Sequence, residues 1–175
     1  MNCPSCGAPM RLKPGEDSYK CDYCQSVYFP EKNEDGVRVL EASDEKCPIC
    51  DVAMSQASLA NTRILYCTRC RGMLVSMEIF KSLISKEQIL QGGSMIQPAA
   101  DTSDLQRKIN CPECHRPMDT HFYEGPGNVV IDSCDHCLVN WLDRGELARI
   151  AHAPDELNPA TMMDLGPDRY EDSDL

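Results

Sequence analysis

Short apolar runs dominate the hydrophobic pattern of the chain, and turn-forming residues separate them. Residues 63–66 and 129–131 are such runs, and their length and composition predict strands. Turn-forming residues occur at 13–17 and again at 125–128, immediately before the second of these runs. A similar run occupies residues 37–40. The pattern therefore predicts a series of short antiparallel hairpins.

Two segments instead repeat apolar residues at the three- and four-residue spacing of a helix, at 77–90 and after Trp141. Their expected apolar faces are Phe80, Leu83 and Ile84 in the first segment and Leu147, Ile150 and Ala151 in the second. Asp143 and Glu146 have the spacing of a helix-capping box, and Pro154 is expected to end that helix. We therefore predict two short helices, one at 77–90 and one after Trp141.

The cysteines connect these elements into repeated units. All 12 cysteines fall in six Cys-x-x-Cys pairs. Three pairs open a repeated octet, Cys-Pro-x-Cys-x-x-(Pro or Ala)-Met, and a second pair follows each octet at nearly the spacing of a four-cysteine zinc site. The twelve candidate metal ligands are Cys3, Cys6, Cys21, Cys24, Cys47, Cys50, Cys67, Cys70, Cys111, Cys114, Cys134 and Cys137.

Zinc suits four thiolates because it accepts a tetrahedron of sulfur ligands and does not change its redox state. We expect three zinc ions, one for each octet, because the repeat makes each unit self-contained. A cross-braced pairing, iron in rubredoxin-like sites, a thioredoxin-like use of one pair and replacement of a cysteine by His115 or His136 are the alternatives. Four thiolates leave no open position for water or substrate, so we expect no enzyme and no small-molecule substrate.

The fold expected from these features is a small metal-stabilised α+β protein with three tandem zinc ribbons, each a short antiparallel hairpin. Aromatic residues make up only 6% of the chain, so a single large core would be poorly filled, and small modules need metal or disulfides. The predicted order is ribbon one at 1–30, an acidic connector at 31–46, ribbon two plus helix at 47–91, a flexible linker at 92–110, ribbon three plus helix at 111–152, and an acidic, disordered tail at 153–175.

Two apolar residue types have expected places in these ribbons. Met10, Met54 and Met118 end the three octets, and we expect each to fill the small core beneath its hairpin. Trp141, the single tryptophan, is expected to pack on the third ribbon; its alternative is an exposed anchor for a partner.

The charge of the chain limits its partners. The formal net charge is −11, and twelve thiolates with three Zn²⁺ ions would bring it to −17. Nucleic-acid binding depends on Lys and Arg side chains that neutralise phosphates, so this charge disfavours a nucleic-acid partner. No apolar run approaches the ~20 residues of a membrane span, and Cys3 and Cys6 lie where a signal segment would be. We expect a soluble, cytoplasmic protein with reduced cysteines and no membrane partner.

The third unit also carries a family motif, with CPEC at 111–114, IDSCDHC at 131–137 and WLDRGEL at 141–147. It resembles the transcription-factor-type zinc ribbon, which is related to the N-terminal ribbon of transcription factor IIB. The resemblance is weaker over 47–90, and residues 3–29 are a generic ribbon. It implies zinc binding through Cys111, Cys114, Cys134 and Cys137. The family usually has Gly after its last cysteine, where this chain has Leu138.

Three functions fit this sequence. The first hypothesis is a non-enzymatic adaptor, in which the ribbons bind a protein partner. The second is a protein that binds nucleic acid or associates with the transcription machinery, for which residues 47–91 offer five bases and three acids before metal is counted. The third is a zinc-storage or redox-sensing protein, in which the sites themselves are the function.

Overall fold

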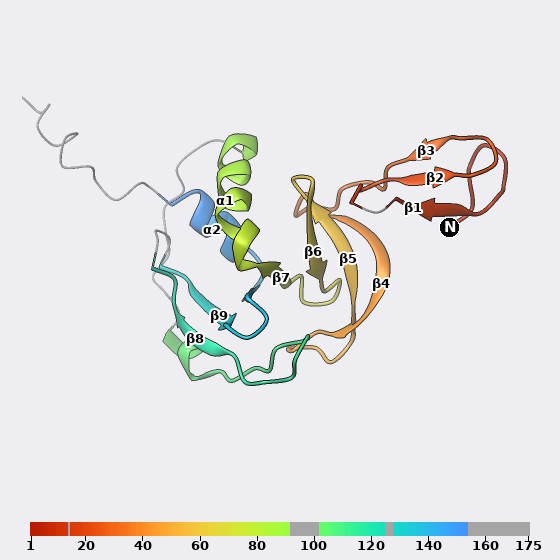
Figure 1. Ribbon diagram of the computed structural model, residues 1–175. Coiled ribbons are helices and arrows are strands. Elements are labelled where there is room, and N and C mark those ends of the chain that lie inside the picture. Colours follow the sequence, from red (N-terminus) through yellow and green to blue (C-terminus); the bar gives the residue numbers. More distant parts are fainter. Residues whose placement is uncertain (14, 92–101, 125–127, 154–175) are drawn as a thin grey trace, which may run out of the picture.

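The computed structural model describes residues 1–13, 15–91, 102–124 and 128–153. Their strands form two antiparallel sheets, one of three strands and one of seven. The three-stranded sheet belongs to unit one, residues 1–30, and it projects from one side of the molecule (Figure 1). Units two and three, residues 47–91 and 111–152, both contribute to the larger sheet.

Unit one is a minimal ribbon. Its strands are β1 (Met10–Leu12), β2 (Tyr19–Cys21) and β3 (Val27–Tyr28), in the order β1-β2-β3. Four buried residues form its core: Cys3, Met10, Tyr19 and Cys21. Leu40 from the following strand packs against this core, so unit one rests on the larger sheet at one edge.

The larger sheet has the order β4-β5-β6-β7-β10-β9-β8. Its strands are β4 (Arg38–Lys46), β5 (Ala53–Leu59), β6 (Thr62–Tyr66), β7 (Met73–Ser76), β8 (Asp119–Phe122), β9 (Val130–Cys134) and β10 (Val139–Leu142). The strands predicted at 63–66 and 129–131 correspond to β6 and to the beginning of β9. Three residues of the turn predicted at 125–128 lie outside the described residues.

The seam between β7 and β10 joins units two and three into one body. Leu74 lies four residues after Cys70 and Trp141 four residues after Cys137, and these two equivalent positions pair directly. Because the strands are antiparallel and equivalent positions face each other, the two units are related by a local twofold axis through this pair. The three tandem ribbons expected from the sequence are consistent with the three cysteine groups, and the strands of units two and three form one continuous sheet. Both seam strands are almost fully buried, and each has three apolar residues and one polar residue.

Two helices cover the sheet after the seam. Helix α1 (Met77–Gln91) follows β7, and α2 (Glu146–Ala151) follows β10. They pack against each other, as Figure 1 shows, on the same side of the molecule. Their buried residues join one hydrophobic cluster with side chains from both units, including Phe80, Leu83, Leu147 and Ile150. The helices thus bury their apolar faces in a core that neither unit has alone.

The connector at 31–46, whose acidic composition predicts a solvated segment, contains a strand that begins within the apolar run predicted at 37–40. Residues 38–46 form β4, the edge strand that pairs with β5. The turn before it is held by Asp35, whose carboxylate accepts hydrogen bonds from the Tyr66 hydroxyl (2.7 Å) and from the Arg71 guanidinium. Val37 is fully buried. Buried Val37 and the partly buried Asp35 therefore fix this segment, while most of its other acids are exposed.

The predicted linker at 92–110 is described only from residue 102. There the chain forms a short 3-10 helix, η1 (Thr102–Gln106), and Arg107 then makes two ion pairs with unit three. This part of the linker is therefore attached to the third ribbon. Residues 92–101 and 154–175, which include Pro154 and nearly all of the predicted acidic tail, lie outside the described residues.

Candidate metal centres

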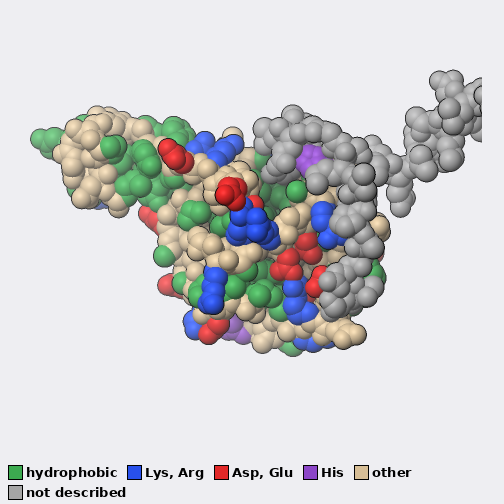
Figure 2. Space-filling model, turned by 180° about the vertical axis from the view of Figure 1, so that it is seen from behind, with side chains coloured by type: hydrophobic (Ala, Val, Ile, Leu, Met, Phe, Trp, Pro, Cys, Tyr) green, Lys and Arg blue, Asp and Glu red, His purple; other side chains and the backbone are tan. Residues whose placement is uncertain are grey.

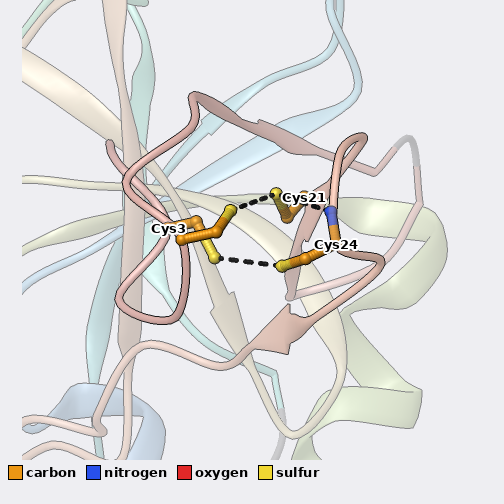
Figure 3. A group of neighbouring side chains, drawn as sticks. Cys3, Cys21 and Cys24 are labelled. Carbon is orange, nitrogen blue, oxygen red and sulfur yellow. Dashed lines mark hydrogen bonds between the residues drawn. The ribbon is translucent and has the colours of Figure 1, made fainter.

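The twelve cysteines form three groups of four. The groups are Cys3, Cys6, Cys21 and Cys24; Cys47, Cys50, Cys67 and Cys70; and Cys111, Cys114, Cys134 and Cys137. Each group takes both pairs from one unit, so the structure has the sequential pairing expected from the octet and not the cross-brace. In Figure 3 the side chains of Cys3, Cys21 and Cys24 converge from the two knuckles of unit one.

The distances between the sulfur atoms fit a tetrahedral zinc ion. Within each group all four sulfurs lie within 4.8 Å of one another. The closest pairs include Cys47–Cys70 and Cys114–Cys134, both at 3.6 Å. Four sulfurs at about 2.3 Å from one zinc ion would lie about 3.8 Å apart, whereas disulfide sulfurs lie about 2.0 Å apart. The three groups therefore have the ligands and the spacing of three zinc sites.

Each octet folds as a knuckle whose backbone closes on itself. In unit two the Cys47 carbonyl accepts a hydrogen bond from the Asp51 N–H at 2.9 Å, and the Cys50 N–H points at the Cys47 sulfur at 3.3 Å. The residue before each octet then pairs with the octet's seventh residue: Asn2 with Pro9, Lys46 with Ala53 and Asn110 with Pro117. This pairing turns the terminal Met inward, and Met10, Met54 and Met118 are all buried as expected.

The residue after the second cysteine of every knuckle has a left-handed backbone. These residues are Gly7, Gln25, Asp51, Arg71, His115 and Leu138, with φ between 53° and 75°. Gly adopts this conformation without a steric penalty, but only the first of the six is Gly. Leu138, which replaces the Gly usual in the family, adopts the same conformation with φ 56°. The knuckle geometry therefore dominates the local preference of the side chain.

The surroundings of the cysteine thiols raise the pKa of some and lower the pKa of others. Burial raises the pKa of Cys47 and of Cys111 to about 11. In unit one the hydrogen bond between Ser26 and Cys24, with Oγ and Sγ 3.0 Å apart, lowers the pKa of Cys24 to about 6. Zinc binding requires thiolates, so the metal must displace the protons of the buried cysteines when it binds.

Sites two and three share one hydrophobic cluster. It contains the first cysteine of all four knuckles together with Met54, Met118, Leu74 and Trp141. Trp141 is fully buried, as expected, but it packs on both units and not on the third ribbon alone. A Cβ atom at Gly72 would lie 2.3 Å from its ring, so only Gly fits there. The two metal sites are thus parts of one packed structure.

The family motif residues of unit three form a polar network around this tryptophan. Arg107 pairs with Asp132 at 2.7 Å and also with Asp143, and Asp132 is fully buried. The Trp141 indole N–H donates to the Asp143 carboxylate at 3.0 Å. Sequence reasoning missed Arg107, because a basic residue in a polar segment is typical of a solvated linker.

Half of the predicted capping box is present. The Glu146 carboxylate accepts a hydrogen bond from the Asp143 N–H at 2.6 Å. The Asp143 side chain does not cap the helix, because its carboxylate instead contacts Trp141 and Arg107. Helix α2 begins at Glu146 after Gly145, which has no side chain to act as a cap. Burial raises the pKa of Glu146 to about 8.

Histidine ligands are not needed at these sites. His115 and His136 are exposed, and neither belongs to a cysteine group. His121 lies beside the Ser133 hydroxyl at 3.0 Å.

Among the described residues, no helix is long and apolar enough to cross a membrane.

Comparison with known proteins supports the motif in two of the three units. Residues 46–86 and 110–153 match the family model described as transcription factor zinc-finger, the zinc ribbon of the transcription factor IIB type. No curated protein and no solved structure matches the chain. The predicted resemblance is therefore confirmed: the second and third units are zinc ribbons that match the transcription factor zinc-finger family, and the first unit adds a third four-cysteine site outside the matched segments.

Proposed function

We propose that this chain is a non-enzymatic adaptor, in which zinc-held ribbons present a surface to a protein partner. The observation that carries this proposal is the distribution of exposed apolar side chains. Seven large hydrophobic residues are exposed in the described part of the chain, and four of them belong to unit one: Met1, Tyr23, Val27 and Phe29. Clustered exposed apolar side chains mark interaction sites on soluble proteins.

The geometry of β3 places two of these side chains, Val27 and Phe29, on one surface. Tyr28 points inward, where it packs against the core of unit one, so Val27 and Phe29 on either side of it point outward. Tyr23, in the second knuckle, is 84% exposed. Figure 2 shows hydrophobic side chains on the projecting lobe that unit one forms. We call Tyr23, Val27 and Phe29 the apolar patch.

Unit one is held at a fixed place on the larger sheet. The Arg63 guanidinium donates to the backbone carbonyls of Lys13 and Glu16, and Arg38 pairs with Asp17 at 3.3 Å. These contacts bridge unit one to strands β4 and β6. The apolar patch is therefore presented by a ribbon that is anchored to the two-ribbon body, as a docking surface requires.

The metal sites support a structural role. In each group four thiolates would fill the coordination sphere of zinc, and a catalytic zinc normally keeps one position for water or substrate. The zinc would hold the knuckles together and supply folding free energy to a unit as small as residues 1–30.

A second candidate function is association with the transcription machinery, which the family match of units two and three favours. The net charge of −11 favours a protein of that machinery over nucleic acid as the direct contact. This candidate differs from the first only in the identity of the partner.

A pull-down with zinc retained tests the proposal. Tagged wild-type chain is compared with a Tyr23→Ser/Phe29→Ser variant and with Phe122→Ser, which removes an exposed aromatic side chain from unit three. We expect a stoichiometric protein that survives nuclease treatment and moderate salt, is lost with the double variant, and is retained with the control. Loss of the captured material on nuclease treatment, or equal capture by all three chains, would contradict the proposal.

A further inference from the structure

The three metal sites differ in how well protein covers them. In unit one the second cysteine of each knuckle, Cys6 and Cys24, is exposed to solvent. The four equivalent residues of sites two and three are only partly exposed: Cys50, Cys70, Cys114 and Cys137. The first site therefore has two cysteines that are exposed to solvent, whereas sites two and three have none.

The hydrophobic clusters around the sites differ in the same way: the cluster at site one is the smallest. Sites two and three share a cluster of ten buried residues, and their partly buried cysteines pack against it. The core beneath site one has only four buried residues, and Cys6 and Cys24 lie at its exposed side, with their sulfurs 3.5 Å from that of Cys21 and 3.6 Å from that of Cys3. Opening a knuckle of unit one would thus expose little apolar surface, and local opening costs less free energy where few buried contacts break.

We propose that the first site is an exchangeable zinc site, and that its occupancy switches the apolar patch on and off. The exchange rests on the exposure of Cys6 and Cys24 and on the small core beneath the site, and the switch also rests on the function proposed for the patch. Sites two and three keep their zinc and hold the two-ribbon body together.

The patch depends on the first site because it is built on the metal-binding knuckle. Tyr23 lies between the ligands Cys21 and Cys24. Val27 and Phe29 lie on either side of Tyr28, at the end of strand β3, which follows this knuckle. A unit of about 30 residues rarely folds without metal or disulfides. Loss of zinc from site one therefore unfolds the patch, whereas the seven-stranded sheet has its own core and its own two sites.

Zinc release to a chelator tests the exchange. The full chain loaded with three zinc ions is mixed with a chromophoric zinc chelator, and the released metal is counted over time. We expect one equivalent to leave at least about tenfold faster than the other two, since tenfold corresponds to a small difference in the free energy of local opening. A Cys6→Ser/Cys24→Ser variant should lack the fast equivalent and keep the two slow ones. A single release phase, or a fast phase that persists in this variant, would overturn the proposal.

Two further measurements distinguish the switching of the apolar patch from the exchange of zinc at site one. Trp141 lies in the cluster shared by sites two and three, so its fluorescence should stay constant during the fast phase and change during the slow phases. A change during the fast phase would mean that zinc leaves the shared body first. Partner capture should be lost with the first equivalent of zinc and return on its re-addition. Fast release with unchanged capture would overturn the switch and the assignment of the patch, but would leave the exchange standing.

Discussion

The seam between units two and three can be tested by adding one methyl group. A Cβ atom on Gly72 would lie 2.3, 2.9 and 3.1 Å from three ring atoms of Trp141. The ring cannot move freely, because it is fully buried and its indole N–H is hydrogen-bonded to Asp143. The Gly72→Ala variant must therefore displace the ring or separate the strands.

We expect Gly72→Ala to lower the free energy of unfolding by about 1–3 kcal/mol, the usual cost of overpacking a filled core. Gly72 has no left-handed backbone, so the penalty comes from the contact with Trp141 and not from the main chain. The assay is denaturant unfolding with zinc in excess, monitored by far-UV circular dichroism. This signal does not depend on tryptophan, so a variant that lacks Trp141 can be measured in the same way.

A double-mutant cycle isolates the contact. Trp141→Leu copies the residue at the equivalent position of unit two, Leu74, and removes the ring that the new methyl group would strike. We expect Gly72→Ala to cost less in the Trp141→Leu background, with a coupling energy of about 0.5–3 kcal/mol. Additive effects of the two substitutions would refute the packing described for the seam.

Three further predictions concern single residues. Leu138→Gly should raise the free energy of unfolding by about 1 kcal/mol, because Gly adopts the left-handed backbone at φ 56° without strain; a denaturation midpoint that falls would contradict this. Arg107→Ala should cost about 3–5 kcal/mol, because it leaves the fully buried Asp132 without its cation, whereas Arg116→Ala on an exposed residue should cost little in the same unfolding assay. Glu146→Gln should become more stabilising as pH rises towards about 8, because burial raises the pKa of Glu146 to about 8 in the folded chain, whereas the unfolded chain loses this proton at lower pH. From about pH 6 to about pH 8.5 the wild type should lose about 2 kcal/mol relative to this variant, and parallel pH profiles would refute the effect.

The sequence was most informative where the signal was local. The repeated octet predicted the sequential grouping of the cysteines, because each repeat marks a self-contained unit with two pairs of thiolates. Helical spacing identified Phe80, Leu83, Leu147 and Ile150, all of which the structure buries. These features depend on residues a few positions apart, and their geometry follows from the backbone of one turn or one helix.

The sequence did not reveal the seam or the polar network around it. The pairing of β7 with β10 joins residues about 65 positions apart, and short apolar runs carry no mark of the strand they will meet. A signal was present in retrospect, because Met73–Ser76 and Val139–Leu142 lack the polar alternation of a ribbon strand with one face in solvent. Arg107 gave no such signal, since its buried partner Asp132 is visible only in the fold.

Zinc-edge X-ray absorption on a sample whose metal content is also counted tests the central claim most directly. The account predicts three zinc ions per chain, each with four sulfur ligands at about 2.3 Å and no nitrogen or oxygen ligand. Such closed sites would support the structural role on which the proposed adaptor function depends. Fewer than three ions, or an average of three sulfurs with a nitrogen or oxygen ligand at about 2.0 Å, would contradict it, because an open or mixed site has room for chemistry.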